Sequence, residues 1–119
     1  MRIRINGEPM ADKKGTKTDA LKHWEEKLRS TCGQKPSLPF GEYRVRIAFV
    51  IPRERYQATN TQNPHAKDLD NLVIPVFNAL SKTVLEPAHG DGAIVELFAS
   101  KRPSAPAEGA CCRVTITRR

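Results

Sequence analysis

Lys67-Asp68-Leu69-Asp70-Asn71-Leu72 places two carboxylates two residues apart at the start of an apolar stripe. A spacing of three and four residues predicts a helix with one buried face. Pro75 cannot donate a backbone hydrogen bond to the carbonyl of Asn71, so we expect the helix either to begin near Asn71 or to kink there. The apolar stripe consists of Leu69, Leu72, Val73, Val76, Phe77 and Leu80.

A third carboxylate, Asp91, follows the expected helix and precedes a strand-like run at residues 94–100. Acids from two segments that flank one buried helix could meet in space. Three clustered carboxylates repel one another, and a divalent cation that favours oxygen ligands is their usual neutraliser. The competing interpretation is structural, because an aspartate at a helix start commonly caps the helix. The predicted metal ligands are Asp68, Asp70 and Asp91, with Glu96 as an additional candidate.

The polar segment 53–67 leads directly to the first two acids and shows no periodicity. It is long for a loop inside a compact domain, and such loops are often functional. Basic groups beside a carboxylate cluster suit a phosphodiester substrate, whereas a linker without contacts is the alternative interpretation. The predicted DNA-binding side chains of this segment are Arg53, Arg55 and Lys67.

The rest of the chain predicts one small domain. Alternating apolar and polar residues predict strands at 2–6, 43–51 and 111–117, and an apolar run predicts a further strand at 94–101. The last two of these strands along the chain are expected to pair as a hairpin. A helix is expected before Gly33, with Thr16 as its N-cap. We therefore predict an α+β (α/β) fold for residues 1–119, with a mixed sheet of about four strands and two main helices. The stripe of the first helix is Ala20, Leu21, Trp24 and Leu28.

Composition restricts the classes of function. Twenty Lys and Arg against 13 Asp and Glu give a formal charge of +7, which fits a polyanionic partner or a merely basic soluble protein. Aromatic residues make up only 6%, which disfavours an extended base-stacking platform. Three cysteines without CxxC spacing disfavour a disulfide framework or zinc site and favour a reducing cytoplasm. No apolar run predicts a membrane span or signal peptide.

Three motifs in the C-terminal half are similar to those of one known family. They are Asp68-Leu69-Asp70-Asn71-Leu72, Phe77-Asn78-Ala79-Leu80, and Asp91 followed by Ile94-Val95-Glu96-Leu97 and Lys101. With them the chain resembles the RusA-type Holliday-junction resolvases, although residues 1–40 show no match. The resemblance implies a homodimer that nicks four-way DNA junctions with Mg²⁺ or Mn²⁺. It also implies that Asp68, Asp70 and Asp91 are the catalytic metal ligands, and Lys101 joins the predicted DNA-binding residues.

The chain also departs from the family pattern. Ile74 stands where the family has a catalytic lysine, Gly90 replaces the first of two paired acids, and Pro75 replaces a plain helix former. These departures bear on turnover more than on fold. The expected function is a cytoplasmic, metal-dependent endonuclease that acts on branched DNA in recombination and repair. The alternatives are a junction-binding protein with weak or no cleavage, and a metal-dependent hydrolase of another phosphoester.

Overall fold

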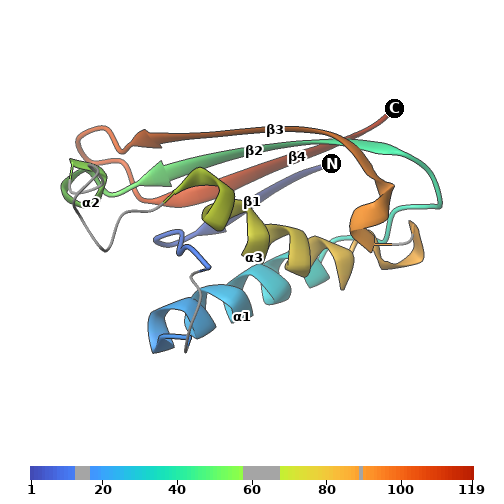
Figure 1. Cartoon of the computed structure of the whole chain (residues 1–119), viewed down its shortest axis with the longest axis horizontal. Coiled ribbons are helices and arrows are strands. Elements are labelled where there is room, and N and C mark those ends of the chain that lie inside the picture. Colours follow the sequence, from blue (N-terminus) through green and yellow to red (C-terminus); the bar gives the residue numbers. More distant parts are fainter. Residues whose placement is uncertain (13–16, 58–67, 89) are drawn as a thin grey trace.

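The computed structural model describes residues 1–12, 17–57, 68–88 and 90–119, and for residues 57, 90 and 91 it describes the backbone alone. Its centre is a four-stranded mixed sheet in the order β1-β4-β2-β3 (Figure 1). β4 is antiparallel to both of its neighbours, whereas β2 and β3 run parallel. The predicted fold class and number of strands are confirmed. The strands are β1 (Arg2–Asn6), β2 (Tyr43–Ile51), β3 (Ile94–Pro103) and β4 (Cys111–Arg118).

The expected hairpin between β3 and β4 is wrong, because β2 lies between these two strands. The connection after β3 carries the chain across the end of β2 before β4 begins. In this order Val45 of β2 is paired with Leu97 on one side and with Ile116 on the other. Cross-strand apolar pairs stabilise a sheet, and the central position gives β2 such pairs on both of its edges.

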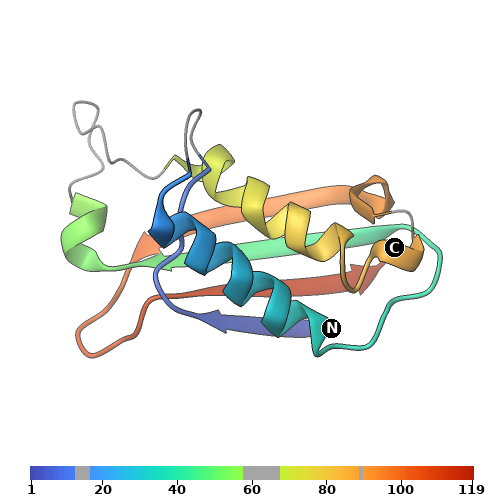
Figure 2. The same ribbon diagram turned by 90° about the horizontal axis from the view of Figure 1, so that it is seen from below.

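Two helices, α1 (Asp19–Gly33) and α3 (Leu69–Ser81), cover the same face of the sheet (Figure 2). Each turns an apolar stripe toward the strands, so the core lies between the helix layer and the sheet. Thr18, rather than Thr16, is the N-cap of α1, and its hydroxyl accepts a hydrogen bond from the backbone N–H of Leu21 at 3.1 Å. Thr16 itself lies outside the described residues. The buried helical side chains are Leu21, Trp24, Leu28 and Cys32 in α1 and Leu72, Val73, Pro75, Val76, Ala79 and Leu80 in α3.

α3 begins at Leu69, two residues before Asn71, and continues through Pro75. The ring nitrogen of Pro75 has no proton, and the carbonyl of Asn71 therefore lacks its usual helical donor. The backbone N–H of Asp12 takes this place and donates to the Asn71 carbonyl at 2.8 Å. The proline thus attaches the segment after β1 to the first turn of α3.

The Pro75→Ala substitution is expected to loosen this attachment. An alanine N–H would compete with that of Asp12 for the Asn71 carbonyl, and one such hydrogen bond contributes about 0.5–1.5 kcal/mol. Hydrogen-exchange protection of the Asp12 amide should fall about two- to tenfold when followed by NMR. Unchanged protection of that amide would show that the contact does not depend on the proline.

The segment after β2 forms a short helix, α2 (Arg53–Gln57), where only irregular structure was expected. The carbonyl of Pro52 accepts the N–H groups of Arg55 and Tyr56, both at 2.9 Å, which closes the first turn. Two 3₁₀ turns, η1 (Glu86–Ala88) and η2 (Gly90–Ala93), connect α3 to β3. No helix in the described ranges combines the length and apolar character needed to cross a bilayer.

Candidate functional site

Asp68 and Asp70 lie at the N-terminal end of α3, and both are exposed. Asp68 occupies the N-cap position, but its side chain makes no capping hydrogen bond. Its backbone carbonyl instead accepts the N–H of Leu72 at 3.0 Å. One oxygen of Asp70 accepts the N–H of Asn71 at 2.9 Å. The Asp68 carboxylate therefore does not cap the helix, which was the structural alternative to its predicted role as a metal ligand.

Asp91 belongs to a different end of the molecule. It lies in η2, which packs beside the C-terminal end of α3, whereas Asp68 and Asp70 stand at the other end of that helix (Figures 1 and 2). Thirteen residues of α-helix span about 20 Å. The structure thus does not bring the three acids together within one chain. Among the described side chains, which do not include that of Asp91, no group of three His, Cys, Asp or Glu could hold a metal.

The separation follows from the parallel pairing of β2 and β3. A helix that connects two parallel strands must run back along the sheet, so its start and its end lie at opposite ends of the strands. The next candidate ligand, Glu96, is also remote, because it is paired with Arg44 on the outer face of the sheet and forms an ion pair with it. The local sequence pattern predicted the helix, but it contained no information about the direction of the strand after it.

Three of the predicted DNA-binding residues lie toward the same end of the sheet as Asp68. Arg53 begins α2, and its backbone N–H and Nε donate to the hydroxyl and carbonyl oxygens of Ser104 at 3.2 and 3.1 Å. Lys101 is near the end of β3, with its ammonium 5.6 Å from the ring centroid of Tyr56. Arg55 lies in the same short helix as Tyr56. Lys67, the fourth predicted residue, is outside the described residues.

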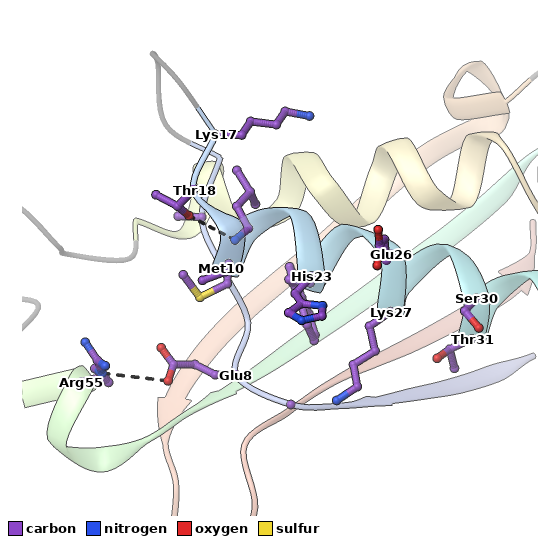
Figure 3. Close-up of a pocket in the computed structure, with 15 residues that line it drawn as sticks. Glu8, Met10, Lys17, Thr18, His23, Glu26, Lys27, Ser30, Thr31 and Arg55 are labelled. Carbon is purple, nitrogen blue, oxygen red and sulfur yellow. Dashed lines mark hydrogen bonds and ion pairs between the residues drawn. The ribbon is translucent and has the colours of Figure 1, made fainter.

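Arg55 also borders a groove of about 950 Å³ between α1, α2 and the segment after β1 (Figure 3). In Figure 3 its guanidinium points toward Glu8, at 4.0 Å from the carboxylate oxygen. Both side chains are accessible to solvent, so this contact is weak. The groove was not predicted, because residues 7–11, residues 17–31 and Arg55 form its walls only once the chain has folded. Its lining includes Met10, Lys17, His23, Trp24 and Lys27.

Ile74 is 41% exposed, as expected for a position outside the buried stripe of α3. It follows Asp70 by four residues, so the two side chains lie on the same side of the helix, one turn apart. Lys82 follows the C-terminal residue of α3 and is remote from Asp70. An exposed apolar side chain therefore stands one turn from Asp70.

Two of the three cysteines, Cys32 and Cys112, do not offer a nucleophile. Cys32, Cys111 and Cys112 are free and buried. Burial raises the pKa of the Cys32 thiol to about 11, and it also raises the pKa of Cys112. A thiol with a raised pKa remains protonated near neutral pH, where the thiolate is the reactive form. Cysteine chemistry is therefore not supported for Cys32 and Cys112.

The chain was also compared with known proteins. No family model matches it, and no curated protein matches it. The features of the chain that bear on function are therefore the two exposed acids at the start of α3, the basic side chains toward the same end of the sheet, and the motifs of the C-terminal half.

Proposed function

We propose that this protein is a divalent-metal-dependent endonuclease that acts on branched DNA, most simply as a Holliday-junction resolvase. The observation that carries the proposal is the Asp68 carboxylate, which is exposed and makes no capping bond beside a second exposed acid, Asp70. Arg53 and Lys101 lie toward the same end of the sheet and suit a phosphodiester substrate. The net charge of +7 favours a polyanionic partner.

The donors present fit a hard cation. Carboxylate oxygens are the ligands that Mg²⁺ and Mn²⁺ prefer, and Asp68 and Asp70 would hold such an ion at the entrance of α3. When bound there, the ion would activate water and stabilise charge on the phosphate oxygens. The chain's own part is to orient the two carboxylates on a rigid helix end and to hold the DNA backbone with Arg53 and Lys101.

The third acid of the proposed site is supplied by a second copy of the chain. Within one chain, η2 and the start of α3 are separated by about one helix length, so Asp91 cannot reach the other two acids. β3 begins directly after η2 and is an edge strand. Its Val95 and Leu97 are exposed, and an edge strand with apolar side chains is a surface that another chain can cover. A homodimer with two symmetric sites would also account for paired nicks across a junction.

A cleavage assay with three labelled substrates tests the proposed function. A four-way junction, a linear duplex and a single strand are each incubated with Mg²⁺, with Mn²⁺ and with a chelator. Paired nicks in the junction that need the metal are expected, with little cutting of the two linear substrates. An intact junction under all conditions would exclude a nuclease, and turnover of a simple phosphoester alone would favour a different hydrolase.

A binding protein with weak or no cleavage is the second candidate, and Ile74 favours it. The position one turn from Asp70 carries no cation to stabilise charge that develops on the phosphate. In that case junction DNA is bound but remains intact in Mg²⁺ and Mn²⁺. The same assay separates the candidates when binding is followed alongside cleavage.

The Ile74→Lys substitution is expected to raise single-turnover junction cleavage. Ile74 is exposed, so a long side chain can be accommodated, and a placed cation is worth up to about 10²-fold in rate. Junction affinity should change little, because one added charge is small beside +7. The control is the Asn78→Lys substitution, because Asn78 is an exposed residue of the same helix and lies farther from the acids. An equal gain from Asn78→Lys would show a general charge effect rather than a placed cation.

A further inference from the structure

The face of the sheet opposite α1 and α3 is rich in arginine. Side chains alternate between the two faces of a strand, and the strand register places exposed arginines from each of the four strands on this outer face, although Arg118 of β4 lies on the opposite face. Both main helices cover the other face (Figure 2). Within the described part of the chain, the outer face is thus a basic surface without a covering helix. Its arginines are Arg2, Arg4, Arg44, Arg46, Arg102 and Arg113.

Only part of this positive charge is balanced by neighbouring carboxylates. Glu96 forms an ion pair with Arg44. Glu108 lies 2.7 Å from Arg102 and 3.9 Å from Arg113. In the described ranges, no carboxylate pairs with the remaining three arginines. These are Arg2, Arg4 and Arg46, of which Arg4 donates only to the neutral Asn6 side chain at 2.9 Å.

The unbalanced arginines form a regular array. Arg2 and Arg46 are both paired with Thr115, from opposite sides, which places their backbones about 10 Å apart at the usual strand spacing. Arg2 and Arg4 alternate on one strand and are therefore about 7 Å apart. Arg46 is also paired with Phe98, and its guanidinium lies 5.1 Å from the ring centroid. The Phe98 side chain is nevertheless 59% exposed, so an aromatic ring borders the arginines.

We propose that this outer face binds the sugar–phosphate backbone of a nucleic acid strand, with Phe98 as the stacking surface for one unpaired base. The guanidinium group matches phosphate oxygens in bidentate geometry, and aromatic rings accept any base by stacking. Three arginines without a carboxylate partner, spaced along one face of the sheet, complement a chain of phosphates. The assignment does not rest on the proposed nuclease activity, since Asp68 and Asp70 belong to the helix layer on the other side of the sheet.

The test is nucleic acid binding in the presence of a chelator, so that cleavage plays no part. Fluorescence anisotropy with a labelled single strand and with a labelled duplex measures Kd at salt concentrations from about 50 to about 200 mM. The double variant Arg2→Gln/Arg46→Gln should lower the single-strand log–log salt slope by about 1.4, from two lost phosphate contacts. The matched control is Lys22→Gln/Arg29→Gln, which removes the same charge from exposed positions of α1. It should leave the slope unchanged.

The stacking contact is tested separately. Phe98→Ala should weaken single-strand binding about tenfold and leave duplex binding unchanged, because paired bases do not offer their faces. Phe40→Ala, at the other strongly exposed phenylalanine, is the control. Thermal melting followed by circular dichroism checks that each variant folds. Equal losses from the outer-face pair and the α1 pair, or no nucleic acid binding by the parent protein, would overturn the proposal.

Discussion

The Asp70→Asn variant is expected to bind junction DNA and to leave it uncut. The exchange keeps the shape of an exposed side chain in the first turn of α3 but removes a negatively charged metal ligand. Metal-assisted charge stabilisation is worth several kcal/mol, so junction cleavage should fall by about 10³-fold or more. Binding should be equal or tighter, because one negative charge near the phosphates is lost. Single-turnover cleavage and junction affinity in the same buffer measure both effects.

Asp19→Asn is the matched control for this variant. Asp19 is an exposed acid in the first turn of α1, so the exchange removes the same charge from the same kind of helix position. It should cost about 0.3–1 kcal/mol of stability at most and leave cleavage unchanged. Cleavage by Asp70→Asn at the parent rate would exclude Asp70 as a catalytic ligand. A similar loss in both variants would point to a general effect of helix stability.

A mixture of two inactive variants is expected to regain activity. If Asp91 of one copy completes the site of another, Asp70→Asn and Asp91→Asn chains can together form one intact site in each mixed dimer. After subunit exchange about half of the dimers are mixed, and about one quarter of the parent cleavage rate should return. Each variant alone should remain near the background. The measurement is junction cleavage before and after the two proteins are equilibrated.

The comparison of cleavage before and after equilibration provides one control, and the choice of the second variant provides another. Asp68→Asn mixed with Asp70→Asn should not recover, because both changes affect the same half of the proposed site and no mixed dimer contains a complete one. Recovery only in the mixture with Asp91→Asn would support a site shared between two copies. Mass spectrometry verifies that subunits have exchanged. If they have exchanged and neither mixture recovers activity, then all three acids act within one chain or Asp91 is not a ligand.

The sequence by itself determined the four strands, the two main helices and the residues through which they face the core. Period-two alternation identified β1, β2 and β4, because each of them buries one face and exposes the other. The three- and four-residue spacing identified the buried stripe of α3, and it correctly left Ile74 outside that stripe. Such patterns are local, since the environment of each residue follows from its place in one helix or strand. The class of fold follows from them.

Only the tertiary structure decided how these elements meet. The position of β2 between β3 and β4 depends on contacts between distant segments, and no local pattern distinguishes it from a hairpin. The direction of β3 then separates Asp91 from Asp70 by the length of α3. The donor that replaces the missing N–H of Pro75 comes from Asp12, sixty-three positions earlier in the chain. Long-range pairing thus determined which charged side chains share a surface, because residues of one face are gathered from all four strands.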